Sequence, residues 1–286
     1  MGLSLINKID LVMWTKNGTA TLPVVLKRIG EVIPGHYVNR RIVVDDHSSD
    51  NTRQIARDFG WEVVFNPGKG IGDGANTALN NVESKYFISF EQDLLLAQDW
   101  WQRIPRHLAN PKTALASGVR LPNQPLVIRN IQKYTLERHK RRGEEADSFY
   151  YGKTVDNTIY KTEVIIDLGG FPPLDGSAGV DSLLAQQIRS NEFEWKVDYN
   201  VISTHLRKGL RQELSHYYWY GSSSIRLNPL LFKRSITVGS VVASFIFSPF
   251  RGLDIAVKTS DPTAIFVYPL IRFAVLKGVF DGMGRV

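Results

Sequence analysis

The chain has 286 residues, of which 43% are hydrophobic and 22% are charged, so it can bury a large core and is not a disordered protein. It has no cysteine, which excludes disulfides, iron–sulfur clusters, zinc ribbons and thiol nucleophiles. The formal net charge of +7 suggests a nucleic-acid-binding protein, but the distribution of the charge along the chain does not. Residues 1–206 carry 24 basic and 24 acidic side chains, whereas residues 207–286 carry 11 and 4. A neutral main part with a basic C-terminus therefore predicts no nucleic-acid partner.

Short apolar runs alternate with amphipathic stretches over the first 120 residues. The apolar runs predict strands over 11–14, 41–44, 62–65, 86–90 and 113–119, and the amphipathic stretches predict helices over 21–33, 49–59, 73–82 and 100–109. Ser49, Asp50 and Asp99 are expected as helix caps. This alternation predicts an α/β fold with a doubly wound, mostly parallel sheet, and a site outside the carboxyl ends of its strands.

From residue 121 onward the pattern changes. One helix is expected to end in the basic run 138–142, which is interpreted either as a solvated helix face or as a membrane-surface helix. Residues 182–189 predict an amphipathic helix, and residues 195–203 predict a strand. Asp181 opens that helix and His205 closes that strand; each residue taken alone is more often a cap or a structural residue.

The C-terminal part is both basic and apolar, which indicates a membrane. Residues 229–250 contain no charge after Arg234, and residues 263–280 contain only Arg272 and Lys277. We expect a two-helix membrane hairpin, over about 230–250 and 263–280. Interfacial or re-entrant helices are the first alternative, and buried helices of a soluble protein are the second. No cleavable signal peptide is expected at the N-terminus.

Two acidic clusters lie where predicted strands end. Asp45 and Asp46 follow the second strand, where carboxylates could accept hydrogen bonds from a nucleotide base and from ribose hydroxyls. Glu91, Gln92 and Asp93 follow the fourth strand. Two acids at this spacing suit a hard divalent cation, Mg²⁺ or Mn²⁺, which would hold a diphosphate in the same shell. The alternative for both clusters is ordinary turn and loop chemistry.

A glycine-rich segment competes with this interpretation. Gly70, Gly72 and Ala75 fit the dinucleotide pattern G-x-G-x-x-A. They follow the third predicted strand across four intervening residues, so the tight strand-to-helix turn of that fingerprint is missing. Lys69 is not followed by Ser or Thr, which also excludes a Walker A loop.

Taken together and in chain order, these clusters closely resemble the family 2 glycosyltransferases of GT-A fold, over roughly residues 8–225. The resemblance rests on Thr15-Lys16-Asn17, the V-D-D-x-S-x-D-x-T block at 44–52, Lys69-Gly70, Glu91-Gln92-Asp93, Gly169-Gly170-Phe171, Asp181 and His205. With its apolar C-terminus, the chain is similar to small cellulose-synthase-like enzymes such as archaeal membrane mannosyltransferases. Residues 211–219 match the Q-x-x-R-W motif of processive synthases only loosely, which argues against processive synthesis.

The resemblance implies a role for each motif residue. Asp46 would hold the nucleotide base or ribose, Asp93 and His205 would bind the Mg²⁺ or Mn²⁺, and Asp181 would be the general base. The expected nucleotide-sugar-binding residues are Thr15, Asn17, Asp45, Asp46, Lys69, Glu91, Gln92, Arg207 and Arg211. The family's D-x-D stands here as Glu91-Gln92-Asp93, and its usual Glu-Asp before the helix stands as Val180-Asp181.

The resemblance also implies an activity. We expect a membrane-bound, inverting enzyme that transfers one sugar, mannose from GDP-mannose, to a hydroxyl of a lipid-linked saccharide. The alternatives are a polyprenyl phosphate acceptor, a UDP-sugar donor, or a catalytically silent membrane adaptor. A silent adaptor would be expected to lose acids among Asp46, Asp93 and Asp181, and all three are present. Membrane lipids are expected as further partners, without an obligate protein partner.

The expected domains follow from these motifs. They are a GT-A catalytic domain over 1–206, with a candidate interfacial helix insertion at 121–150, an interfacial helix over 207–228, and the membrane hairpin over 229–286. Because nucleotide sugars are cytosolic, the catalytic domain is expected to face the cytoplasm in an integral protein of the cell membrane.

Overall fold

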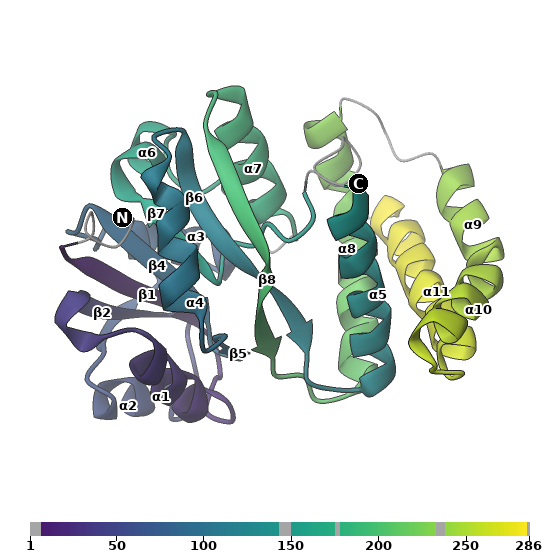
Figure 1. The fold of residues 1–286 in the computed structure, drawn as a ribbon, viewed down its shortest axis with the longest axis horizontal. Helices are drawn as coiled ribbons and strands as arrows, with labels where there is room; N and C mark the ends of the chain where they lie inside the picture. The colour runs from purple at the N-terminus through teal and green to yellow at the C-terminus, as the bar shows by residue number, and fades with distance from the viewer. Residues whose placement is uncertain (1–6, 143–149, 175–177, 233–237, 285–286) are drawn as a thin grey trace. The chain divides into compact units, whose positions relative to one another are not determined.

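The computed structural model describes residues 7–142, 150–174, 178–232 and 238–284 (Figure 1). The chain divides into two compact units. The first unit comprises Met1–Arg120, Gly152–Gly176 and Val180–His205, and the second comprises Leu121–Tyr151, Ser177–Gly179 and Leu206–Val286. Each unit is described by itself. The helix that follows residue 125 groups with the C-terminal helices rather than with the sheet.

One sheet organises the first unit. Among the described residues it has eight strands in the order β3-β2-β1-β4-β7-β6-β8-β5. The strands are β1 Ile9–Thr15, β2 Val38–Asp45, β3 Glu62–Phe65, β4 Tyr86–Glu91, β5 Leu94–Leu95, β6 Thr113–Pro122, β7 Thr158–Lys161 and β8 Glu194–His205. All seven residues of β1 are buried, which agrees with a central strand covered on both faces.

The predicted parallel core is confirmed, and the sheet extends beyond it. β1 pairs in parallel with β2 and β4, and β2 pairs in parallel with β3. β7 is antiparallel to both β4 and β6, so β6 runs in the direction of β4 with β7 between them. β7 and the two-residue β5 are not among the strands predicted from the sequence. Both strands are short, and a short strand gives little periodic signal.

Helices connect the strands of the first unit, and several begin or end away from the predicted positions. They are α1 Leu22–Val32, η2 Gly35–Tyr37, α2 Thr52–Asp58, α3 Gly70–Leu79, α4 Trp100–Arg103, η3 Ile104–Ala109, α6 Thr162–Asp167 and α7 Val180–Ser190. The predicted helix 100–109 continues as a 3₁₀ turn after Arg103, because Pro105 cannot donate the backbone hydrogen bond of an α-helix.

Two other helix starts also differ from the prediction. α2 begins at Thr52 with Asn51 rather than Ser49 at the cap position, although Asp50 still accepts the Thr52 N–H at 3.0 Å. α3 begins three residues before the expected Asp73, whose carboxylate accepts the Lys69 N–H at 2.9 Å and so stabilises the first turn. Asp99 lies at the cap position of α4 as predicted, without a side-chain cap bond.

A buried carboxylate ties the start of the sheet together. Asp10 is fully buried in β1. One oxygen accepts the Arg40 N–H at 3.1 Å, and the other accepts the N–H groups of Glu83 and Ser84 at 2.7 and 2.8 Å. These bonds join β1 to β2 and to the loop before β4. They satisfy backbone donors that would otherwise be buried without a partner.

Apart from the last two residues of β6, the regular elements in the described part of the second unit are helices. They are α5 Leu126–Arg142, α8 Leu210–Phe232, α9 Val238–Ile246, α10 Ser248–Thr259 and α11 Ala264–Met283. α8 and α11 pack closely because glycines face the partner backbone: a Cβ at Gly278 would overlap the Tyr218 carbonyl oxygen, and one at Gly221 would overlap that of Val275. α5, α10 and α11 share an apolar core.

The expected two-helix membrane hairpin is not confirmed. The first expected segment, 230–250, is not one helix, since α8 ends at Phe232 and α9 and α10 follow. Lys233 and Arg234 lie outside the described residues. The second segment is helical throughout, as α11. Within the described residues no single helix has both the length and the hydropathy of a membrane span; the pair α9 and α10, bent by 50°, meets the criterion together.

We expect Asp10→Ala to lower the free energy of unfolding by about 3 kcal/mol or more, since each buried donor left unsatisfied costs about 1–3 kcal/mol. Urea unfolding followed by circular dichroism measures this loss. Asp167→Ala, which removes an exposed acid at the end of α6, is the matched control and should change stability by less than about 0.5 kcal/mol. Equal effects of the two substitutions would contradict the anchoring role of Asp10.

Candidate functional site

The carboxyl ends of three neighbouring strands meet at one edge of the sheet. Thr15 at the end of β1 lies opposite Asp45 at the end of β2, and Trp14 lies opposite Glu91 at the end of β4. The polar residues that follow these strands are therefore neighbours. Parallel strands bring residues from three separate parts of the sequence to the same edge, where open α/β sheets bind their ligands.

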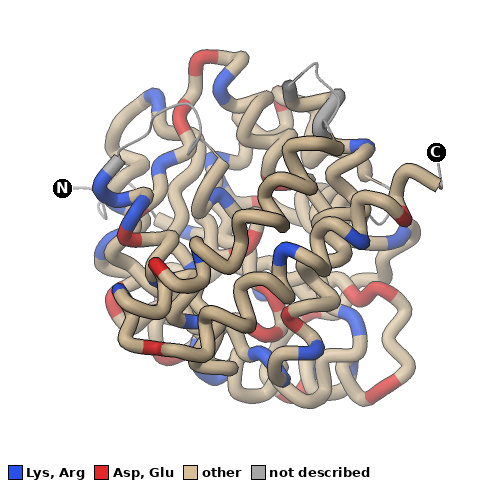
Figure 2. The backbone as a smooth tube through the Cα atoms, turned by 90° about the vertical axis from the view of Figure 1, so that its right-hand side faces the viewer, with Lys and Arg blue, Asp and Glu red and all other residues tan. Residues whose placement is uncertain are grey.

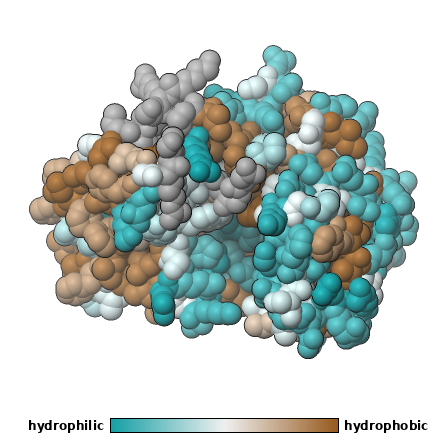
Figure 3. All heavy atoms as spheres, turned by 180° about the vertical axis from the view of Figure 1, so that it is seen from behind, coloured by the Kyte–Doolittle hydropathy of each residue, from teal (hydrophilic) through white to brown (hydrophobic). Residues whose placement is uncertain are grey.

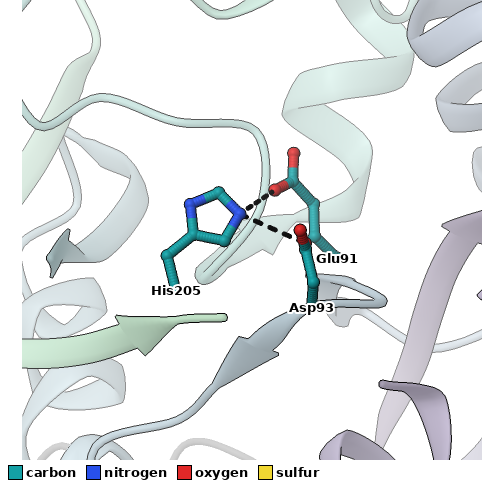
Figure 4. A group of neighbouring side chains, drawn as sticks. All are labelled: Glu91, Asp93 and His205. Carbon is teal, nitrogen blue, oxygen red and sulfur yellow. Dashed lines mark ion pairs between the residues drawn. The ribbon is translucent and has the colours of Figure 1, made fainter. Parts of the chain in front are cut away.

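Glu91, Asp93 and His205 form a compact group at this edge (Figure 4). The His205 Nε2 atom lies 3.1 Å from Asp93 Oδ1 and 3.5 Å from Glu91 Oε2. β5 explains this arrangement, because its antiparallel pairing with β8 sets Leu94 directly opposite His205. The imidazole is buried, whereas each carboxylate is 22% exposed, so the group is open on its acidic side.

This group fits a divalent cation. One ligand atom from each of the three residues lies within 4.8 Å of the others, close enough to share one ion. Carboxylate oxygens suit Mg²⁺ and Mn²⁺, and an imidazole nitrogen is the ligand that favours a transition metal such as Mn²⁺. Three protein ligands leave coordination positions for a substrate diphosphate.

Arg120 lies beside the group and is not among the residues predicted from the sequence. Its Nη1 atom lies 2.9 Å from Glu91 Oε2 and 2.8 Å from Asp156 Oδ1. Asp156 is buried, and a buried carboxylate is stable only when paired with a cation or with hydrogen-bond donors. Arg120 is the one charged residue of β6 and follows a run of uncharged residues, which is the signal that could have identified it.

Asp181, the expected general base, opens α7 in the first unit. Burial raises the pKa of its carboxyl to about 6, and the positive charge of Arg120 opposes this rise. Asp156 interacts with the same carboxyl and raises its pKa further. Asp181 therefore shares an electrostatic environment with Arg120, the cation that contacts Glu91.

Next to the acidic group, hydrogen bonds join the loop after β1 to its neighbouring loops through Thr15, Asn17 and Gln92. The Thr15 hydroxyl donates to Gln92 Oε1, which also accepts the Lys16 N–H at 2.8 Å. Asn17 has a left-handed backbone with φ of 50°, and Ser48 Oγ accepts its N–H at 2.9 Å. These bonds fix the loop after β1 against the loops after β2 and β4.

Asp45 and Asp46 differ in burial and partners. Asp45 is fully buried and accepts the Ser48 N–H at 3.1 Å, which gives it a part in holding the loop. Asp46 is 14% exposed and accepts from Lys16 Nζ at 3.3 Å. Burial alone would raise the pKa of Asp46, but hydrogen bonds from His47 and Lys16 outweigh it and lower that pKa. Asp46 is therefore ionised and accessible, as an acceptor for a ligand should be.

Each of the three expected cationic helpers has surroundings of its own. Lys69 is exposed at the start of α3. Arg207 and Arg211 belong to the second unit. There Arg207 is partly buried, with Nε 2.9 Å from Glu213 Oε1 and Nη1 2.9 Å from His216 Nε2, and Arg211 is exposed on α8. In the first unit, the remaining predicted site residues gather at one sheet edge or, for Asp181, next to it.

Comparisons with known proteins identify the family and the fold. The model of glycosyl transferase family 2 matches residues 10–167, more than half of the chain. No curated protein matches the sequence. Solved structures do: the mannosyltransferase PcManGT from Pyrobaculum calidifontis, in complex with GDP-Man and Mn²⁺, has a TM-score of 0.66 and 16% identity, over 96% of this chain and 87% of that one.

Two further structures share the fold. TarS from S. aureus in complex with UDP-GlcNAc has a TM-score of 0.57 and 11% identity, over 96% of this chain and 91% of that one. Glucosyl-3-phosphoglycerate synthase from Mycobacterium tuberculosis, with Mn²⁺ and UDP, has a TM-score of 0.56 and 15% identity, over 79% and 81%. At these identities the likeness concerns the fold. The chain belongs to glycosyltransferase family 2 and has the GT-A fold.

We expect Asp93→Asn and His205→Gln each to weaken Mn²⁺ binding by about 100-fold, because each removes one of three protein ligands. The EPR signal of free Mn²⁺ measures this change during a titration. Asp99→Asn is the matched control, since it removes a half-exposed acid six residues further along and should leave the affinity unchanged. Wild-type affinity in both ligand variants would contradict the assignment of this site.

Asp181→Asn should raise the melting temperature at pH 8 and leave it unchanged near pH 4. The folded pKa of about 6 lies above the ordinary value of 3.8, so the ionised carboxylate destabilises the fold above pH 6, and the effect vanishes below pH 4. Differential scanning fluorimetry across this pH range measures the difference. The exposed Asp167→Asn is the control, and a constant difference across the range would contradict the raised pKa.

Proposed function

We propose that this chain is an inverting glycosyltransferase that moves one mannose from GDP-mannose to a hydroxyl of a lipid-linked saccharide. The observation that carries the proposal is the group of Glu91, Asp93 and His205 at the edge where nucleotide-binding strands end. Membership of family 2 supports nucleotide-sugar transfer, and the solved mannosyltransferase with GDP-Man supports the choice of donor.

In this proposal, residues of the first unit have separate roles in binding the donor and the metal. Asp46 accepts hydrogen bonds from the base or ribose, next to the hydrogen-bonded side chains of Thr15 and Gln92. Asp93, Glu91 and His205 are placed to hold Mg²⁺ or Mn²⁺, which supplies charge neutralisation for a leaving diphosphate. Arg120 holds Glu91 in place and balances the acidic charge when no ion is present.

Asp181 takes the proton of the acceptor. The acceptor oxygen forms a bond to the anomeric carbon, the bond from that carbon to the diphosphate breaks, and the hydroxyl proton moves to the Asp181 carboxylate. A base works best when its pKa lies near the operating pH, and a pKa of about 6 meets this condition better than an ordinary aspartate. Attack from the face opposite the leaving group inverts the configuration of that carbon.

The presence of a general base also favours one type of acceptor over another. A polyprenyl phosphate is already anionic and needs no base, whereas a sugar hydroxyl does. The raised pKa of Asp181 therefore favours a saccharide hydroxyl, with polyprenyl phosphate as the second candidate. UDP-sugars stand as the second candidate donor, because two of the similar structures contain UDP or UDP-GlcNAc.

We further propose that the enzyme is membrane-bound with its first unit facing the cytoplasm. Nucleotide sugars are cytosolic, and a lipid-linked acceptor lies in the bilayer. The basic excess of residues 207–286, 11 basic against 4 acidic side chains, supports attachment at the cytoplasmic face.

A donor panel tests the proposed activity. The purified chain in detergent, with Mn²⁺ and a membrane lipid extract, should release nucleoside diphosphate from GDP-mannose and leave UDP-glucose and UDP-GlcNAc intact. Product release requires both the extract and the metal. Faster turnover of either UDP-sugar would contradict the proposed donor.

Asp181→Asn should keep nucleotide affinity while turnover falls by about 10²–10⁴-fold, because the amide cannot accept a proton. In the wild type, turnover should rise with pH through about 6 as the carboxylate ionises. Calorimetry with GDP-mannose and Mn²⁺ measures affinity separately from turnover. Equal loss of both would show that Asp181 is a structural cap, and unchanged turnover would favour the phosphate acceptor.

A further inference from the structure

A basic cavity lies on the second unit, where α5 and α10 meet. It has a volume of about 340 Å³ and is lined by Tyr134, Arg138, Arg141, Arg251, Asp254 and Lys258. Among the described residues that line it, four are cationic and one, Asp254, is a carboxylate. A neighbouring cavity of about 530 Å³ continues this surface along α5, and its lining includes the cations Lys133, Arg141 and Lys258 and one acid, Glu137. All of these residues belong to the second unit, so the cavity is complete within it.

Asp254, the carboxylate in this described lining, is already engaged. Asp254 lies 2.7 Å from Lys258 Nζ and accepts the Tyr134 hydroxyl at 2.5 Å. Arg251 and Lys258 lie over the Tyr134 ring, 5.1 and 5.6 Å from its centre, and these contacts hold the two cations at the cavity. Cations gathered in this way repel one another, and a bound anion with several oxygens relieves the repulsion.

An exposed apolar face lies next to these cations on the same helix. Phe250, Leu253 and Val257 on α10 are 72%, 52% and 74% exposed, and their spacing of three and four residues places them on one side of the helix. Exposed Phe266, Leu270 and Phe273 form a similar row on α11. Figure 3 shows apolar side chains gathered over the C-terminal helices, and Figure 2 shows long uncharged stretches of these helices with basic positions beside them.

We infer that this surface docks on a negatively charged phospholipid membrane, with a lipid phosphate in the cavity and the apolar rows of α10 and α11 among the acyl chains. A bilayer surface is the partner that presents phosphate and hydrocarbon within the reach of one helix. Arginine pairs with phosphate through two hydrogen bonds, and the aliphatic stem of lysine lies along apolar surface while its amine reaches the headgroups. The inference deepens the proposed function, since it specifies how the membrane is recognised.

The shape of α10 favours a position along the interface. Its 12 residues span about 18 Å, which is short of a hydrocarbon core of about 30 Å. Charged Arg251, Asp254 and Lys258 form one side of the helix, the exposed apolar row forms another, and buried Ile255 and Ala256 face the core of the unit. A helix with a charged side, a buried side and an exposed apolar side lies in the plane of a membrane surface.

Vesicle partitioning of the full chain tests the inference. Vesicles of phosphatidylcholine alone are compared with vesicles that also contain phosphatidylglycerol. Arg251→Gln with Lys258→Gln should weaken binding to the anionic vesicles by about 30-fold, since each basic residue near an anionic surface contributes about a factor of five. Arg138→Gln with Arg141→Gln removes the α5 side of the cavity and should act in the same direction.

Two further variants separate charge from apolar contact. Lys27→Gln with Arg57→Gln is the matched control, because it removes two exposed cations from the first unit, and it should bind both vesicles like the wild type. Phe250→Ser with Val257→Ser should weaken binding to both kinds of vesicle. Each variant must have the wild-type circular dichroism spectrum and a cooperative thermal transition, which shows that the helices of the second unit are folded.

Three outcomes would overturn the inference. The first is equal binding of the cavity variants and the wild type to anionic vesicles, and the second is equal loss in the Lys27 and Arg57 control. The third is stabilisation of the wild type, but not the cavity variants, by inorganic phosphate or glycerol phosphate without any vesicle preference; this result would assign the cavity to a soluble phosphate compound. Failure of the proposed function is separate, because absent sugar transfer leaves partitioning unchanged.

Discussion

The pairing of two-residue β5 with the end of β8 holds the candidate site together. Leu94 lies opposite His205, so Asp93 and the imidazole meet although they are 112 positions apart. This contact places two carboxylates and an imidazole within 4.8 Å of one another. Two acids at this separation repel each other, so the site needs positive charge. Arg120 supplies part of it and leaves the exposed side of the acids to an ion.

Burial then distinguishes carboxylates that have the same chemistry. Asp10 and Asp45 are fully buried and satisfy backbone N–H groups, so they stabilise the fold. Asp46 remains partly exposed with its pKa lowered, which suits binding. Asp181 has its pKa raised to about 6, which suits proton transfer. These environments fit the structural, binding and basic roles that we propose for the four aspartates, and the unfavourable ionisation of Asp181 is a cost that the rest of the fold offsets.

The sequence predicts the features that depend on local patterns. Buried strands of several residues appear as apolar runs, and polar residues that follow them mark the site, so the edge formed by Thr15, Asp46 and Glu91 could be found. Asp156 could not be found, and Arg120 is marked only as a lone charge after an uncharged run, because the partners of these charges are 29 to 36 residues away. A single polar residue carries no periodic signal, and its importance depends on what folding brings near it.

The C-terminal part shows a second limit of local patterns. An apolar stretch of sufficient length indicates a membrane span, but composition does not show where a helix ends. In the structure, the stretch 230–250 is not one helix. α8 ends at Phe232, and α9 and α10 follow, with Pro249 in the first turn of α10. Because α10 begins at Ser248, Phe250 and Val257 lie on one exposed face of this helix, beside Arg251. Amphipathic organisation of this kind becomes visible only when the helix limits are known.

The most direct test of the account is the position of the metal. Crystals soaked with Mn²⁺ and GDP would be measured by anomalous scattering at the manganese absorption edge. The account predicts one strong peak in contact with Asp93 and His205, on the exposed side of Glu91, with the diphosphate beside it. A well-occupied diphosphate at this sheet edge without any anomalous peak, or a peak held by other residues, would contradict the claim that β5 and β8 build a metal site.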